Sequence, residues 1–125
     1  LGTWLSPAEF TKQFGKGRKL NEENPSLNQL IVVESMYSVT GSNADLRIPV
    51  KPGDTRKVAL AIAKAVSELG GNAYGQLGSV DVDAISKESG YSAETIRKIA
   101  KALWSAKGES LVVGGGTSSA SADAV

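Results

Sequence analysis

The sequence predicts an α/β protein in which helices cover a mainly parallel sheet. Two apolar runs rich in β-branched residues, Leu30–Val33 and Leu111–Val113, have the pattern of strands buried on both faces. Helical patterns alternate with these runs, and Gly and Pro residues separate them, an order typical of α/β layers. We therefore expect one three-layer lobe, incomplete in this chain, as a single partial domain over residues 1–125.

The first part of this domain, residues 1–53, is expected to hold a helix, a buried strand and a long loop. Ser6-Pro7-Ala8-Glu9 is a capping box with proline at the first helical position, so a short helix should begin there. After the strand, the stretch 34–53 is expected to be irregular because Gly41, Pro49 and Pro52 interrupt it.

The second part, residues 54–125, is expected to hold helices, the second strand and a Gly-rich turn. Asp54, Asp81 and Ser92 are suited to cap helices that end at Gly70, Gly90 and Gly108. Each helix carries an apolar stripe at helical spacing. In the first these residues are Val58, Ile62, Ala65, Val66 and Leu69, and in the last they are Ile96, Ile99, Ala100, Leu103 and Trp104.

Composition excludes several kinds of chemistry. The 125 residues include neither cysteine nor histidine, which rules out disulfides, thiolate clusters, His-ligated metals and Cys or His nucleophiles within them. A net charge of +1 gives no electrostatic case for a nucleic-acid or membrane-surface protein. No apolar run approaches the roughly 20 residues of a membrane helix. Both ends look cut, so we expect a fragment of a longer protein.

Gly114, Gly115 and Gly116, followed by Thr117, are candidate cofactor-binding residues. A buried strand that leads into a Gly-rich turn and a helix start offers backbone N–H groups that could hold a phosphate. The turn lacks the spacing of a dinucleotide fingerprint and the lysine of a P-loop. The alternative, which composition favours, is a tight strand-to-helix turn.

Glu34 is a second candidate for cofactor binding. It follows a predicted strand, where open α/β sheets place ligand contacts, and it could accept a hydrogen bond from a ribose or amine. Arg47 could pair with an anion, and Glu34 with Asp45 could form an acid/base pair. In the alternative, again favoured by composition, both carboxylates hold turns and Arg47 is bonded within the fold.

Residues 80–104 match the spacing of a helix-turn-helix, a DNA-binding motif. The matching positions are Ile85, Gly90, Ser92, Thr95, Ile96 and Ile99. Residues 81–107 hold five basic and four acidic side chains, whereas binding to phosphates needs a marked basic excess. A helix pair packed on a sheet edge explains the same spacing.

Three stretches resemble one family in order along the chain. The segment 32–35, running into 39–47, resembles the molybdopterin-oxidoreductase-like B subunit of bacterial alternative complex III, a quinol:electron-acceptor oxidoreductase. Leu1–Phe10 is similar to the segment that follows a strand end in the same subunits. Ser92–Ala100, followed by Leu111–Gly116, is similar to a helix entry, strand and turn found widely in molybdopterin oxidoreductases.

The resemblance implies a fragment of a molybdopterin-oxidoreductase-like domain without chemistry of its own. It implies a structural part of a respiratory electron-transfer subunit, whose iron–sulfur clusters lie elsewhere and pass quinol electrons to a periplasmic acceptor. The expected partners are other subunits of a membrane-bound complex, including a multihaem cytochrome c, with no nucleic acid and no direct membrane insertion. The expected location is the periplasmic side of the inner membrane. As an alternative, the same lobe binds a pterin dinucleotide in a catalytic molybdenum enzyme.

Overall fold

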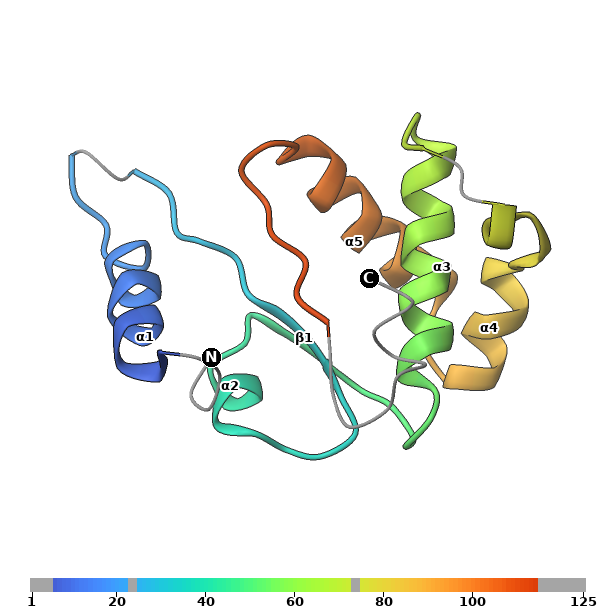
Figure 1. Cartoon of the computed structure of the whole chain (residues 1–125), viewed down its shortest axis with the longest axis horizontal. Helices are drawn as coiled ribbons and strands as arrows, with labels where there is room; N and C mark the ends of the chain where they lie inside the picture. Colours follow the sequence, from blue (N-terminus) through green and yellow to red (C-terminus); the bar gives the residue numbers. More distant parts are fainter. Residues whose placement is uncertain (1–5, 23–24, 73–74, 115–125) are drawn as a thin grey trace. The chain divides into compact units, whose positions relative to one another are not determined.

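The computed structural model describes residues 6–22, 25–72 and 75–114, and it divides the chain into two compact units. The first unit ends at Pro49 and the second begins at Val50. The prediction of a single partial domain stays a prediction. Helices and a small parallel sheet both occur, so the chain is α/β at the coarse level (Figure 1).

The first unit holds two helices and the two strands of the sheet. They follow the order α1 (Pro7–Lys16), β1 (Ile31–Glu34), α2 (Val39–Ser42) and β2 (Leu46–Pro49). Helix α1 begins where the proline at its first position predicts, but the Ser6 side chain makes no cap hydrogen bond to the backbone. Its hydroxyl faces the Glu9 carboxylate at 3.5 Å instead.

Strands β1 and β2 are parallel neighbours, with Ile31 paired with Leu46 and Glu34 paired with Pro49. The prediction of an irregular stretch over residues 34–53 is therefore wrong. Pro49 lies at the last position of β2, where a proline is tolerated because the ladder needs no further donor. β1 is half-buried along its length rather than buried on both faces, whereas Ile48 of β2 is only 1% exposed.

The second unit is a cluster of three mutually packed helices, α3 (Thr55–Glu68), α4 (Val82–Ser89) and α5 (Ala93–Ser105). A short 3₁₀ helix, η1 (Gly75–Ser79), lies between α3 and α4 along the chain. The core consists of Ala61, Ala65, Val82, Ile96 and Ala100, with Ile62, Val66, Ile85 and Ala93 packed against it. Small alanines on α3 and α5 allow the two helices to approach closely.

The predicted starts of the three helices and the end of α4 at Gly90 are confirmed, whereas α5 ends at Ser105, before the predicted Gly108. Asp81 accepts hydrogen bonds from the N–H groups of Asp83 and Ala84, and Ser92 accepts one from Thr95. Gly90 follows α4 with a φ of 79°, the left-handed conformation that glycine adopts without strain. Asp54 precedes α3 without a cap bond and pairs with Lys57 at 3.2 Å instead.

The predicted second strand, Leu111–Val113, is wrong. These residues follow α5 without strand structure, and their exposed fractions are 85%, 57% and 55%. A strand needs a neighbour that supplies backbone hydrogen bonds, and within the described residues the sheet has only β1 and β2. β-branched composition alone therefore did not make this run a strand.

Candidate functional site

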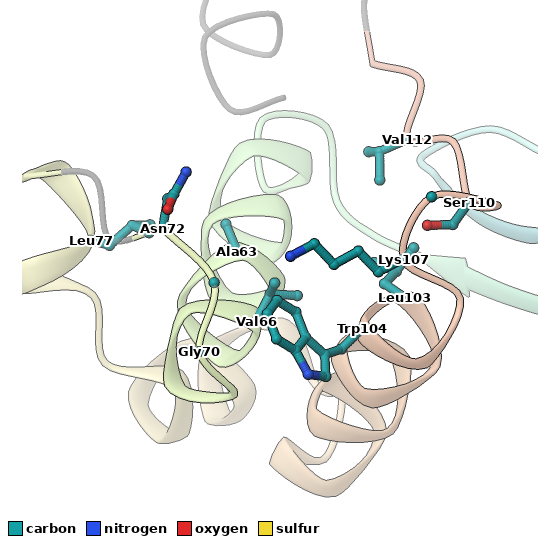
Figure 2. Close-up of a pocket in the computed structure, with 12 residues that line it drawn as sticks. Ala63, Val66, Gly70, Asn72, Leu77, Leu103, Trp104, Lys107, Ser110 and Val112 are labelled. Carbon is teal, nitrogen blue, oxygen red and sulfur yellow. The ribbon is translucent and has the colours of Figure 1, made fainter.

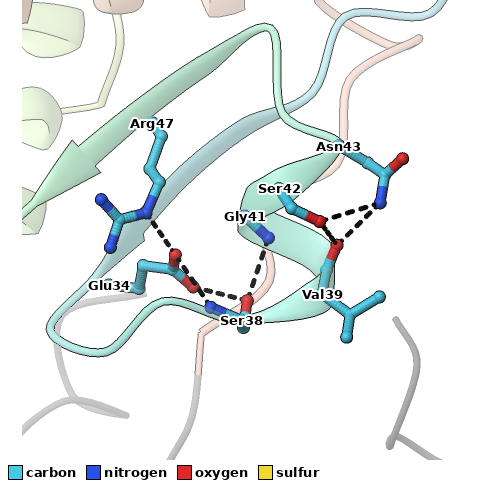
Figure 3. A network of polar contacts seen from close by, with 7 residues as sticks. All are labelled: Glu34, Ser38, Val39, Gly41, Ser42, Asn43 and Arg47. Carbon is cyan, nitrogen blue, oxygen red and sulfur yellow. Dashed lines mark hydrogen bonds and ion pairs between the residues drawn. The ribbon is translucent and has the colours of Figure 1, made fainter.

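The candidate site is the connection between the two parallel strands, where Glu34, Ser38 and Arg47 form one polar network (Figure 3). β1 places Glu34 at its carboxyl end, and β2 carries Arg47 opposite Val32. Ser38 is the N-cap of α2, so its position depends on the single helical turn that follows it. The three side chains are thus brought together by the parallel pairing and by the cap.

Both carboxylate oxygens of Glu34 are used in this network. Oε1 accepts from Arg47 Nε at 2.5 Å and from the Ser38 backbone N–H at 3.3 Å. Oε2 accepts from the Ser38 hydroxyl at 2.5 Å. The Ser38 hydroxyl oxygen in turn accepts from Gly41 N–H at 2.9 Å, which completes the α2 cap. The network therefore links the end of β1, the start of α2 and the middle of β2.

The network also sets the charge state of Glu34. The Ser38 hydroxyl, and after it the Arg47 guanidinium, lower the pKa of the Glu34 carboxyl, although burial acts in the opposite direction. The Glu34 side chain is 12% exposed and that of Arg47 is 24% exposed. Glu34 is thus a carboxylate at neutral pH with its charge compensated, so it is poorly suited to act as a general base.

Gly41 makes room for the Glu34 carboxylate. It is buried, and a Cβ atom at this position would collide with the Glu34 carboxylate oxygens. The space that a Cβ of residue 41 would fill is occupied by the Glu34 carboxylate, because α2 passes directly beside it. The sequence indicated Gly41 only as a breaker, and its role in packing depends on the fold.

Asp45 belongs to a separate cluster at the start of β2. Arg18 binds it with two nitrogens, at 2.7 and 2.8 Å, and the Leu30 N–H donates to it at 2.7 Å. Arg18 also donates to the Asn28 carbonyl at 2.6 Å. The Arg18 hydrogen bonds, followed by the Leu30 N–H, lower the pKa of the Asp45 carboxyl to about 2. Asp45 is therefore part of a structural clamp, and sequence reasoning missed Arg18 because it lies 27 residues away.

The structure does not bring Glu34 and Asp45 together as an acid/base pair. Glu34 bonds to Ser38 and Arg47, whereas Asp45 bonds to Arg18 and Leu30. These contacts agree with the alternative given above, in which both carboxylates hold turns and Arg47 is bonded within the fold. The Arg47 guanidinium lies over the ring of Tyr37, an exposed side chain, with its carbon 4.7 Å from the ring centre.

The other predicted cofactor-binding residues lie mostly outside the described part of the chain. Gly114 is exposed in the segment after α5, and Gly115, Gly116 and Thr117 fall outside the described residues. The assignment of these four residues and Glu34 to a cofactor stays a prediction. Among the described residues, no three carboxylates lie close enough together to hold a metal ion.

The second unit has a concave surface, a groove of about 410 Å³ between the carboxyl ends of α3 and α5 (Figure 2). Val66, Leu77, Leu103, Trp104 and Val112 provide most of its apolar lining. Lys107 lies over Trp104, with Nζ 4.9 Å from the ring centre, a cation–π contact at the edge of the groove. Trp104 therefore lines a surface rather than filling the core.

Comparisons with known proteins found no match. No family model matches the sequence, and neither a curated protein nor a solved structure is significantly similar to it. None of the described helices has the length and apolar character needed to cross a membrane.

Proposed function

We propose that this chain is a structural part of the molybdopterin-oxidoreductase-like iron–sulfur subunit of alternative complex III. In that subunit quinol electrons would pass through iron–sulfur clusters outside these 125 residues to a periplasmic acceptor. The segment would hold the cluster-bearing part beside a multihaem cytochrome c, on the periplasmic side of the inner membrane. The parallel β1–β2 pair would form part of a larger three-layer lobe.

The observation that carries this proposal is the bonding of the Glu34 carboxylate to side chains and backbone of its own strand connection. The stretch with the most specific resemblance, residues 32–47, folds into a strand, a turn and a strand whose polar groups bond to one another. A carboxylate that recognises a ligand needs free lone pairs directed at it, and Ser38 and Arg47 occupy three of the roughly four acceptor positions of Glu34. This supports a scaffold role over the alternative, a pterin-dinucleotide lobe of a catalytic molybdenum enzyme.

Purification of the native protein from its source membranes in mild detergent tests the proposal. Mass spectrometry should find the sequence within a longer polypeptide that co-purifies with a multihaem cytochrome c and polytopic membrane proteins. A free protein of about 13.0 kDa, without haem or iron, would contradict it. A bound pterin dinucleotide would favour the catalytic alternative.

Quinol turnover of a Glu34→Gln variant, measured in the assembled complex, distinguishes a structural role of Glu34 from a functional one. The variant keeps the shape of the side chain and its bonds to Ser38 in part, so quinol turnover should stay within about twofold of the wild type. Arg47→Gln, which removes the other member of the ion pair, is the matched control and should behave alike. Loss of turnover in Glu34→Gln alone, with normal assembly, would refute the scaffold role.

A helix-turn-helix DNA-binding protein is the second candidate. The observation in its favour is that α4 and the Ser92-capped α5 follow one another through a short turn at Gly90 and both pack on α3. Its test is fluorescence anisotropy with duplex DNA, in which specific binding should weaken steeply as the salt concentration rises. The near balance of charge over residues 81–107 disfavours it.

A further inference from the structure

Helix α5 presents a basic stripe, defined as Arg97, Lys98 and Lys101, on its solvent side. All three residues are exposed, while Ile96, Ile99 and Ala100 on the other side of the helix are buried in the core. α5 lies in the three-helix unit of the chain (Figure 1), so the core contacts of Ile96 and Ala100 fix which side the stripe occupies. The stripe covers about one turn of the helix.

The fold makes little use of this stripe. Arg97 reaches the Asp83 carboxylate of α4 at 3.2 Å, and both side chains are more than half exposed. Lys98 and Lys101 form no ion pair or hydrogen bond with any residue in the described part of the chain. Arg97 and Lys101 are four residues apart on one helix, a spacing at which like charges destabilise the helix. The repulsion between Arg97 and Lys101 therefore acts against the stability of α5.

We propose that the basic stripe of α5 is a docking surface for an acidic patch on a partner protein subunit. The inference rests on the proposed function, because it names the surface by which this segment joins its complex. Carboxylates on a protein surface can be spaced to meet three cations within one helical turn. Ion pairs of this kind contribute to the specificity and rate of association, while the rest of the interface buries the apolar surface that provides affinity.

Charge complementarity favours an acidic protein over duplex DNA as the occupant. Glu94 is exposed and lies three and four residues before Arg97 and Lys98, on the same side of α5. Asp83, which pairs with Arg97, is also exposed. A duplex would bring a continuous row of phosphates against these two carboxylates, whereas a protein can avoid them. The stripe thus suits a discrete pattern of negative charges.

Zero-length carbodiimide cross-linking of the complex purified from source membranes tests the proposal. The reaction joins an amine to a carboxylate in direct contact, so Lys98 or Lys101 should be joined to an Asp or Glu of another polypeptide. Charge reversal, K98E/K101E, should reduce the co-purifying partner by about tenfold and make assembly sensitive to salt. K98Q/K101Q removes the charges without reversing them and should give a smaller loss, with the helical circular dichroism unchanged.

The matched control is K12E/K16E, which reverses two exposed lysines on α1 and should leave the partner bound. If an intact complex forms but Lys98 and Lys101 are joined only within their own chain, and K98E/K101E assembles normally, the docking proposal is overturned and the proposed function stands. If the wild-type chain purifies without partners, the proposed function fails as well. Salt-dependent binding to a duplex of about 30 base pairs, lost in K98E/K101E, would assign the stripe to nucleic acid instead.

Discussion

At the scale of the residue, the functional question depends on where a few polar side chains direct their bonds. Glu34, Arg47 and Asp45 are the residues that a sequence reader would place in a ligand site, and each is bonded inside the fold. A carboxylate near a strand end can either bind a ligand or hold the fold together, and its hydrogen-bond partners show which role it has. Here Ser38, Arg18 and Leu30 provide those partners.

Gly41→Ala tests whether the Glu34 network stabilises the strand connection. The added Cβ would displace the Glu34 carboxylate and break its bonds to Ser38 and Arg47, so the free energy of unfolding should fall by about 1.5–3 kcal/mol. Gly15→Ala in α1 is the control, because a Cβ there meets nothing within 4 Å and a helical alanine should stabilise by about 0.5–1 kcal/mol. Urea unfolding compares the two, and equal midpoints would contradict the role given to Gly41.

Asp45 should make stability depend on pH in acid. Its pKa is lowered to about 2 in the folded chain from an ordinary 3.8, so the folded state binds fewer protons than the unfolded state between these values. The stabilising contribution is complete above about pH 4 and is lost as the pH falls towards about 2. Thermal unfolding across this range should show a shallower loss in Asp45→Asn, whereas Glu22→Gln, at an exposed site, should follow the wild type.

At the scale of the element, two of the four predicted cap residues make a cap bond and the other two do not. Asp81 and Ser92 each satisfy backbone N–H groups of the helix that follows, and Gly90 adopts the positive φ that its position requires. Ser6 and Asp54 have the right residue type, yet their side chains bond elsewhere. A cap residue therefore predicts where a helix begins better than it predicts the bond.

Cap replacements should reproduce this difference. Asp81→Ala and Ser92→Ala each remove an observed cap bond, and each should lower the free energy of unfolding by about 1 kcal/mol. Ser6→Ala removes no such bond and should change it by no more than a few tenths of a kcal/mol. Chemical denaturation followed by circular dichroism measures all three, and a loss at Ser6 equal to that at Asp81 would contradict the bonding described.

At the scale of the whole molecule, the three-helix unit has a well-defined core, whereas in the described part of the chain the sheet consists of two short strands. A two-stranded sheet offers little apolar burial of its own, which agrees with the half-buried state of β1. Ile96 is fully buried, but Trp104, which the sequence placed on the same apolar stripe, is only half-buried at the rim of a groove.

Replacement by alanine should therefore lower the free energy of unfolding more at Ile96 than at Trp104, although tryptophan is the larger residue. Ile96→Ala should cost about 2–5 kcal/mol, and Trp104→Ala should cost less than Ile96→Ala because part of its ring already contacts solvent. Hydrogen exchange should show the loss of protection for Ile96→Ala in α3, α4 and α5, where its packing partners lie. A larger cost for Trp104→Ala would mean that the tryptophan is more deeply buried than described.

The sequence by itself determined α1, α3, α4 and α5 and the place of the first strand, but it did not indicate α2. Apolar residues at helical spacing define α3 and α5, and the caps at Asp81 and Ser92 with Gly90 define the helix pair, because all these signals act within a few residues. The absence of cysteine and histidine likewise excluded whole classes of chemistry without any structure.

Only the tertiary structure decided which runs become strands and what the candidate site residues do. Leu46–Pro49 is a strand because β1 supplies its hydrogen bonds, whereas the more β-prone Leu111–Val113 has no such neighbour among the described residues. Glu34 is bound to Arg47 across 13 residues, and Asp45 to Arg18 across 27. Strand pairing and polar bonding connect residues far apart in the chain, so no local pattern encodes them.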